Sequence, residues 1–285
     1  MAAAVLKREG RIECRGVGKA FGEEWARAVV VQDASFAVEQ GQLNVVIGPS
    51  GCGKTTLINL VAGYEPPTAG EILIDGQRIT GPGPDRLVVF QETALFPWMT
   101  SLENVTFGPI VRGMSAGAAR DEARRLLERV GLKGFEDKYP SQLSGGMQRR
   151  CELARALINQ PKIMLMDEPF RGLDAMTREL MQEYLLRLFE DTRTTILFVT
   201  SELEEAIFLG DRLLILSARP TSVKRVLPVD LPRPRDFRVL TTARYAELKQ
   251  QALETLYEEA VKAFSKGSQA AYDLVEAFGR RSGGA

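Results

Sequence analysis

Gly48-Pro49-Ser50-Gly51-Cys52-Gly53-Lys54-Thr55 follows an apolar run, Leu43–Ile47, and opens a segment with helical spacing, Lys54–Ala62. The octapeptide satisfies the P-loop pattern G-x-x-x-x-G-K-[ST] in full, in the strand-to-helix context that the pattern requires. Its glycines let successive backbone N–H groups surround a phosphate, and the start of the helix adds partial positive charge. A glycine-rich turn that only closes a strand is the alternative, and the flanking strand and helix favour the phosphate cradle.

Each part of the cradle has an expected role toward a nucleoside triphosphate. The Lys54 ammonium would reach the β- and γ-phosphates, and the Thr55 hydroxyl would be a ligand for Mg²⁺. The remaining phosphate contacts are expected from Gly48, Pro49, Ser50, Gly51, Cys52, Gly53 and Thr56. The pattern indicates a nucleoside triphosphatase and does not define which kind.

Composition and charge narrow the function classes. The chain has 285 residues, of which 45% are hydrophobic and 26% charged, as in an ordinary globular protein with one large domain. Lys+Arg and Asp+Glu balance at 37 each, so no global field attracts nucleic acid or anionic lipid. No apolar run approaches the roughly 20 residues that cross a bilayer. We therefore predict no nucleic-acid partner, and any membrane role would depend on a separate protein.

Strand and helix patterns alternate along most of the chain. Short strands are expected over 11–17 and 35–38, as a small β layer, and over 71–75 and 87–90. Residues 101–158 are mostly helical, and the alternation then resumes through strands over 163–166, 195–199 and Arg212–Leu216. This order predicts an α/β fold in which helices cover a largely parallel sheet and a helical insertion interrupts it.

A second acidic motif ends the strand that starts at Ile163. Its sequence is Ile163-Met164-Leu165-Met166-Asp167-Glu168-Pro169. The end of a buried strand would place Asp167 beside the P-loop, where it can hold Mg²⁺ through water. Glu168 is then placed to orient the attacking water and accept its proton. A solvated acidic turn is an equally good explanation of these two acids alone, but their combination with the P-loop favours catalysis.

The stretch Leu143-Ser144-Gly145-Gly146-Met147-Gln148 resembles the signature of ABC transporter ATPases, LSGGQ, in a variant with Met before Gln. Ser144 would cap a helix whose first turn exposes glycine N–H groups, which makes a second anion cradle. In the ABC family this cradle, here Ser144, Gly145, Gly146 and Gln148, closes on the γ-phosphate held by the opposite subunit. The resemblance implies a RecA-like P-loop core with an antiparallel β layer, and ATP as the nucleotide.

Other positions of the family pattern follow in order. Phe21 occupies the place of the aromatic that stacks on adenine, and Trp25 is a nearby rival. Gln91 fits the Q-loop glutamine that touches Mg²⁺ and senses the γ-phosphate. Leu173-Asp174 resembles the D-loop, with Arg171-Gly172 in place of the usual small pair. The resemblance covers about residues 11–235.

Four further stretches narrow the resemblance to importers of nitrate, sulfonate, taurine and related small organic anions. They are residues 81–86, 90–92, 95–100 and 204–212. Residues 91–98 would line the groove that receives a helix of the membrane permease. The resemblance thus implies a permease, a second ATPase subunit and a substrate-binding protein as partners. It also implies a peripheral location on the cytoplasmic face of the inner or plasma membrane. The transported solute cannot be predicted, because it is selected by the partners.

The pattern fails at one position. Thr200-Ser201-Glu202 stands where the family has Thr-His-Asp, and the chain contains no histidine at all. The family histidine contacts the γ-phosphate and holds the catalytic geometry; serine is shorter and cannot titrate near neutrality. Three explanations remain open: pairing with a complete ATPase subunit in a heterodimer, slow hydrolysis, or action of Ser201 through a water. Of these we favour the mixed assembly over a homodimer.

The resulting domain prediction has three parts. Residues 1–10 form an N-terminal extension, and residues 11–235 form the ABC ATPase domain with a helical subdomain over about 92–158. Residues 236–285 form a C-terminal helical extension, in which Leu248, Ala252, Leu256 and Ala260 recur at period four. The prolines 228, 232 and 234 are interpreted as a linker before it. The extension either regulates or dimerises, or it only covers apolar surface of the core.

Overall fold

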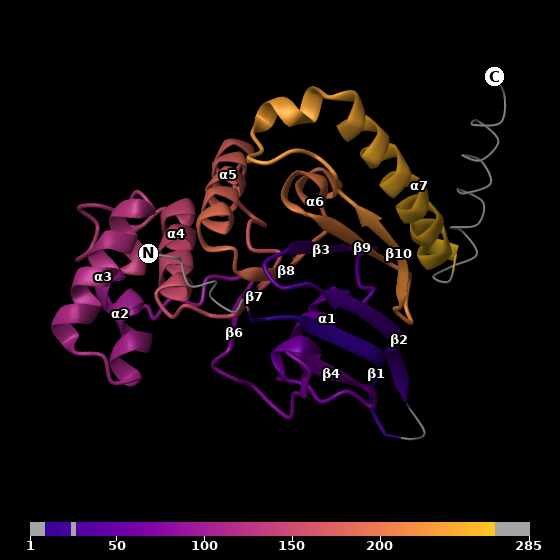
Figure 1. Cartoon of the computed structure of the whole chain (residues 1–285), viewed down its shortest axis with the longest axis horizontal. Helices are drawn as coiled ribbons and strands as arrows, with labels where there is room; N and C mark the ends of the chain where they lie inside the picture. Colours follow the sequence, from indigo (N-terminus) through magenta and orange to yellow (C-terminus); the bar gives the residue numbers. More distant parts are fainter. Residues whose placement is uncertain (1–8, 24–26, 266–285) are drawn as a thin grey trace, which may run out of the picture.

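A computed structural model describes residues 9–23 and 27–265 of the chain (Figure 1). The predictions for the first eight residues, for Trp25 and for the tail beyond Ser265 lie outside these residues. Within them, no helix combines the length and the apolar composition that crossing a membrane requires.

A six-stranded sheet forms the centre of the molecule, in the order β10-β9-β3-β8-β7-β6. All neighbouring pairs are parallel except β9 and β10, which are antiparallel. Every residue of β3, β7 and β8 is buried, because layers cover both faces of the sheet, and this explains their mostly apolar sequences. The strand bounds are β3 (Leu43–Ile47), β6 (Arg86–Val89), β7 (Ile163–Asp167), β8 (Thr195–Thr200), β9 (Arg212–Leu216) and β10 (Val223–Pro228).

A second, antiparallel sheet lies beneath the first and has the order β2-β1-β4-β5. Its strands are β1 (Ile12–Phe21), β2 (Ala28–Val38), β4 (Ala69–Ile74) and β5 (Gln77–Arg78). β1 and β2 pair as far as Phe21 and Ala28, well beyond the short strands expected from the sequence. Register shifts within this pairing accommodate irregularly spaced polar residues and glycines. Because of this irregular spacing, the sequence pattern predicts only short strands here.

The helices occupy the places that the alternation predicts. Figure 1 shows α2, α3 and α4 grouped at one end of the molecule, next to α5. These three helices enclose a core of their own, which includes Val105, Leu127 and Cys151. The helix bounds are α1 (Lys54–Ala62), α2 (Ser101–Val111), α3 (Ala116–Arg129), α4 (Gly145–Leu157), α5 (Ala175–Thr192), α6 (Leu203–Leu209) and α7 (Ala243–Ser265).

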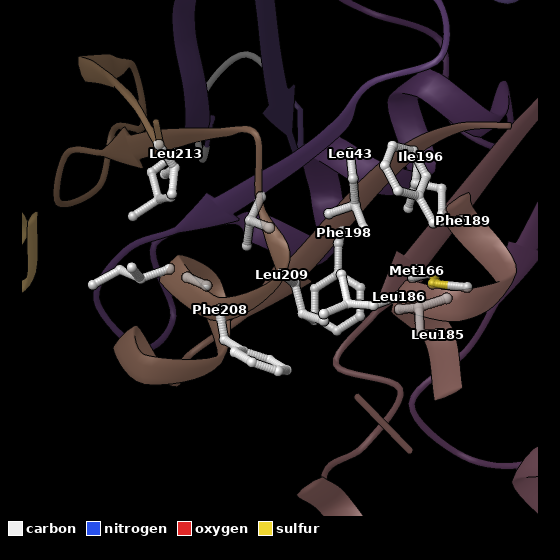
Figure 2. Packing of buried hydrophobic residues seen from close by; sticks show 14 of the residues in the cluster. Leu43, Met166, Leu185, Leu186, Phe189, Ile196, Phe198, Phe208, Leu209 and Leu213 are labelled. Carbon is white, nitrogen blue, oxygen red and sulfur yellow. The ribbon is translucent and has the colours of Figure 1, made fainter. Parts of the chain in front are cut away.

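The two faces of the central sheet are buried in two different clusters. Leu43, Val45 and Ile47 of β3 point toward α5 and α6, into the cluster around Phe198 that Figure 2 shows. Val46, between them, points to the other face, where α1 and the antiparallel sheet cover it. The strand is thus apolar on both sides, and its end is fixed in position by both clusters.

The interpretation of residues 228–234 as a linker is wrong. Pro228 ends β10, an edge strand that the sequence analysis missed, and Val229 and Leu231 behind it are buried in the main core. Val229 also donates its N–H to Asp211, at 2.9 Å. The prolines therefore lie on an extended segment that is packed against the domain.

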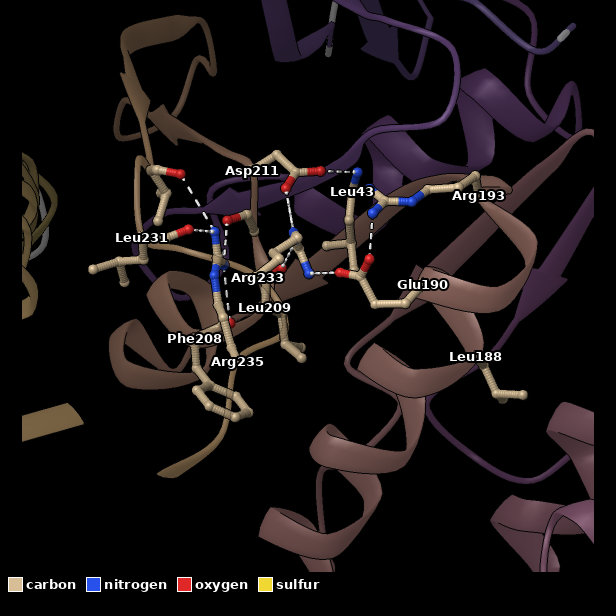
Figure 3. Close-up of polar contacts among 12 residues, drawn as sticks. Leu43, Leu188, Glu190, Arg193, Phe208, Leu209, Asp211, Leu231, Arg233 and Arg235 are labelled. Carbon is tan, nitrogen blue, oxygen red and sulfur yellow. Dashed lines mark hydrogen bonds and ion pairs between the residues drawn. The ribbon is translucent and has the colours of Figure 1, made fainter. Parts of the chain in front are cut away.

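Two arginines, Arg233 in this segment and Arg235 directly after it, hold it to α5, to the end of α6 and to Asp211 before β9 (Figure 3). Arg233 forms ion pairs with Asp211, at 2.7 Å, and with Glu190, at 3.1 Å. Arg235 is buried and donates to several carbonyls around the end of α6, including that of Gly210 at 2.7 Å. Burial lowers the pKa of Arg235 to about 10. These carbonyls would lack intrahelical partners, so the arginine satisfies acceptors at the end of α6.

α7 begins at Ala243 and lies along α6, β9 and β10. Tyr245, Leu248 and Ala252 on its inner face belong to the same cluster as the central sheet. Leu256 packs partly against that cluster, whereas Ala260 is exposed. The first half of α7 is therefore part of the main core.

Candidate nucleotide site

The P-loop joins the end of β3 to the start of α1, and Gly53 is required there by space as well as by its backbone angle. Gly53 has φ of 120°, and a Cβ there would lie 2.9 Å from a methyl carbon of Val30. Gly53 also precedes α1 without capping it by a side chain. The first N–H groups of the helix are therefore left for a ligand, as an anion site at a helix N-terminus needs.

Lys54 is buried, and its ammonium group is held over the loop. Nζ donates to the carbonyls of Gly48, at 2.9 Å, and Pro49, at 3.3 Å. The Thr221 hydroxyl donates to the carbonyl of Cys52 and fixes the loop from the side of β10. These contacts fix the backbone of the loop and hold the Lys54 ammonium beside it.

Asp167 ends β7 and is buried beside the start of α1. Its carboxylate is hydrogen-bonded to the side chain of Thr55. Burial raises the pKa of Asp167, although Thr55 and Lys54 both act in the opposite direction. A buried carboxylate next to a hydroxyl is a suitable ligand set for a hard divalent cation, and the charge of that cation would stabilise the ionised form of the carboxylate. These residues fit Mg²⁺.

Glu168 follows Asp167 in a left-handed conformation, with φ of 43°. Its N–H donates to the carbonyl of Val199 on β8, at 2.9 Å, so the turn is tied to the neighbouring strand. Its carboxylate forms an ion pair with Arg171, at 2.9 Å. A pocket of about 120 Å³ opens here, lined by Glu168, Phe170, Arg171, Arg178, Thr200, Ser201, Glu202 and Glu205.

Ser201 is exposed and lies on this pocket, directly after β8. Buried Glu205 lines the pocket too, and its carboxylate accepts from Gln182, at 2.8 Å, and from Thr200. Burial raises the pKa of Glu205. The carboxyl ends of the adjacent strands β3, β7 and β8 thus bring together the P-loop, both predicted acids and Ser201.

The signature residues lie elsewhere, at the start of α4. The Ser144 hydroxyl accepts from the N–H of Met147, at 3.3 Å, and so caps the helix as predicted. A Cβ on Gly146 would lie 2.7 Å from Thr177, so this glycine is required by space. Gln148 donates to carbonyls of its own chain, those of Pro140 and Leu143, so its role toward a nucleotide stays a prediction. Within the described residues, no hydrogen bond joins these residues to the P-loop.

The remaining predicted contacts are exposed in the subunit. Phe21, at the end of β1, is 39% exposed, and the Lys19 ammonium lies 4.9 Å from its ring centre. Gln91 is also exposed, and its backbone carbonyl accepts from Arg149, at 2.6 Å. Both side chains are thus accessible to a ligand, and their roles stay predictions.

Two arginines near the site were not assigned a role from the sequence. Arg149 on α4 forms a buried ion pair with Glu152, and only their spacing of three on a helix could have indicated it. Arg171 was noted as a departure from the family pattern. Its contact with Glu168 could not be inferred, because both residues lie in an irregular turn.

A strand-to-helix phosphate loop, with two acids at the end of another parallel strand of the same sheet, defines a P-loop ATPase. The chain belongs to the ABC transporter family: residues 31–171 match the family described as ABC transporter. The predicted α/β fold with a RecA-like core and the predicted ATPase activity coupled to transport are confirmed.

Several relatives cover most of the chain. It is 42% identical over 252 residues to an uncharacterised ABC transporter ATP-binding protein of Methanocaldococcus jannaschii, covering 88% of this chain and 93% of that protein. It is 42% identical over 247 residues to the nitrate import ATP-binding protein NrtD of Synechococcus elongatus, covering 85% and 89%. It is 41% identical over 239 residues to the aliphatic sulfonates import ATP-binding protein SsuB of Bacillus cereus, covering 84% and 93%.

A solved structure shows the same fold in a dimer. It is the dimeric post-hydrolysis state of an ATP-binding cassette bound to ADP and phosphate, with a TM-score of 0.69 and 29% identity. The similarity covers 78% of this chain and all of the other.

Proposed function

We propose that this subunit powers the import of a small anion, such as nitrate or an aliphatic sulfonate, through a separate membrane permease. The observation that carries the ATPase part is that the P-loop after β3 and the acids Asp167 and Glu168 after β7 lie at the same edge of the central sheet, with β8 between the two strands. The relatives named for nitrate and sulfonate import support the direction and the class of solute. A substrate-binding protein would deliver the solute, and the subunit would lie on the cytoplasmic face of the membrane.

The permease contact is proposed at the loop after Gln91. Trp98 is 69% exposed, and it stacks on Phe96, with 5.5 Å between ring centres. Asn104 holds the backbone of Phe96 through hydrogen bonds of 2.8 and 3.1 Å, so the aromatic pair is presented by an ordered loop. An exposed aromatic on an ordered loop suits a protein partner.

The residues of the site have distinct roles in the proposed reaction. Lys54 and the loop N–H groups bind the phosphates, and Glu168 orients the attacking water and takes its proton. Thr55, Asp167 and Gln91 would hold Mg²⁺, which supplies charge neutralisation on the phosphates when bound. Ser144 and the two glycines after it would complete the site of a second subunit, so the working form is a dimer. Phe21 would stack on adenine.

The test is a transport reconstitution. Co-expression with the neighbouring permease genes should yield a membrane complex that contains this subunit, and nitrate or a sulfonate should stimulate its ATPase rate. Native mass spectrometry of that complex gives the subunit composition. A chain that purifies alone, with no permease and no solute response, would contradict the importer proposal.

A second candidate rests on Ser201. A regulatory subunit that binds ATP but hydrolyses it weakly, beside a complete ATPase, would explain the missing histidine. The intact Lys54, Asp167 and Glu168 favour turnover. Steady-state hydrolysis by the purified subunit separates the two: an inactive chain that still binds MgATP would support the regulatory role.

A further inference from the structure

The turn that follows Glu168 carries an arginine aimed back at it. The Arg171 N–H donates to the carbonyl of Glu168, at 3.1 Å, and its guanidinium contacts a carboxylate oxygen of Glu168, at 2.9 Å. Both contacts arise within one tight turn, so the position of Arg171 is fixed by the backbone that positions Glu168. The pair is formed by residues three apart and needs no rearrangement.

Two other charged groups around the pocket, Arg178 and Glu205, have partners other than Glu168. Arg178 donates to the carbonyl of Leu173, at 3.1 Å. Glu205 is hydrogen-bonded to Gln182 and Thr200. Glu202 also lines the pocket, and it adds negative charge that favours a nearby cation. Among the described residues, Arg171 is therefore the cation with a direct ion pair to Glu168.

The side chains of Glu168 and Arg171 differ in how much of each is exposed, and this difference suits a role of Arg171 in positioning Glu168. The Glu168 side chain is only 11% exposed, whereas that of Arg171 is 62% exposed. The carboxylate is thus largely buried, whereas the guanidinium lines the pocket and stays exposed to solvent. A guanidinium is always charged and has five N–H groups in a fixed plane. It can restrain one carboxylate oxygen and leave the other for a water.

Ser201 lies on the same pocket, and this links the two departures from the family pattern. A serine hydroxyl is too short and has no charge to hold the geometry that a histidine holds. We propose that Arg171 is a positioning residue that orients Glu168 and so takes over the orienting role of the absent histidine. This inference rests on the proposed role of Glu168 as the base.

The test is a double-mutant cycle on the full chain, with ATP hydrolysis as the readout. Arg171→Ala should lower kcat about tenfold and leave KM for ATP within about twofold, because orientation and not binding is lost. In a Ser201→His background the same substitution should cost less than about threefold, since the histidine again holds the geometry. Arg171→Lys should recover part of the rate by restoring the charge.

Arg187 offers a matched control on α5, because it is an exposed arginine paired with Glu183 at 3.5 Å. Arg187→Ala should change neither constant. Equal losses from Arg171→Ala in the wild-type and Ser201→His backgrounds, or no loss in either, would overturn the inference. Glu168→Gln separates this result from a failure of the proposed function. If that variant still hydrolyses ATP normally, the assigned base is wrong and the positioning role falls with it; if it is inactive, additive losses refute only the role of Arg171.

Discussion

Arg149 and Glu152 form an ion pair inside the helical subdomain, and Arg149→Met tests what the pair contributes to stability. The side chains are 4% and 2% exposed, and the charged atoms are 2.5 Å apart. Arg149 also donates to the carbonyls of Phe90, at 2.8 Å, and Gln91, at 2.6 Å. Burial lowers the pKa of Arg149 and raises that of Glu152, so each charge depends on the other.

The substitution should be strongly destabilising. It leaves the Glu152 carboxylate buried with the N–H of Ala94, at 3.1 Å, and with Arg155 no nearer than 4.0 Å. Removing one partner of a buried pair costs roughly 3–5 kcal/mol. At about 2–4 °C per kcal/mol for a domain of this size, the melting temperature should fall by roughly 6–20 °C.

Thermal unfolding followed by calorimetry measures this effect. The control is Arg129→Met, which breaks an exposed pair with Asp191 of 2.8 Å and should cost less than about 1 kcal/mol. The double variant Arg149→Met, Glu152→Leu should recover more than half of the loss, because no unpaired charge stays buried. A melting temperature for Arg149→Met equal to that of Arg129→Met would refute the argument, as would a double variant no more stable than the single one.

The other predictions concern nucleotide, pH and the C-terminal helix. Lys54→Ala should abolish tight ATP binding in an equilibrium assay, and unchanged affinity would contradict the phosphate cradle. Glu168→Gln should still bind ATP, stop turnover and elute as a dimer with MgATP in size-exclusion chromatography; a monomer with normal turnover would contradict the assigned base. Burial raises the pKa of Glu205 above 4.5, so its ionisation disfavours the folded state at higher pH. The melting temperature of Glu205→Gln relative to wild type should therefore rise as the pH increases above about 4.5, and then level off; a pH-independent difference would refute this. Deleting the chain from Ala243 should destabilise the domain, because Tyr245 and two further residues of α7 are part of the main core; unchanged thermal unfolding would contradict this.

Elements that are buried on both sides could be predicted from the sequence with correct ends. β3 and α1 have the expected bounds, because an apolar run and the P-loop glycines mark the same junction. β10 could not be predicted in this way. It is an edge strand in which Leu227 is the buried residue, Lys224 and Arg225 are exposed, and Pro228 with the two prolines after the strand resembles a linker. Its pairing with β9 is a tertiary contact that local composition does not encode.

The candidate site likewise has parts that local sequence motifs predict and parts that depend on tertiary contacts. Phosphate and metal contacts lie in contiguous motifs, so their chemistry is visible in a few residues. The contacts of Arg149 with the backbone of Phe90 and Gln91 span nearly sixty positions and carry no motif. They show that the loop after β6 and the signature helix α4 are held together in one subdomain. That connection depends on two buried charges, and the sequence shows them only as ordinary charged residues of a helix.

Positions 171 and 201 are far apart in sequence, and each considered alone indicates a defect. A missing histidine favours a subunit that depends on a complete partner, and an arginine in the D-loop has no evident use. Together they line one pocket with Glu168, and the arginine forms an ion pair with the Glu168 carboxylate. A charged group supplied from within the same turn removes the need for a second, different ATPase. A mixed assembly is needed only where the loss of the histidine at position 201 has no compensation within the same subunit. If Arg171 orients Glu168, two identical subunits can each hold a working site.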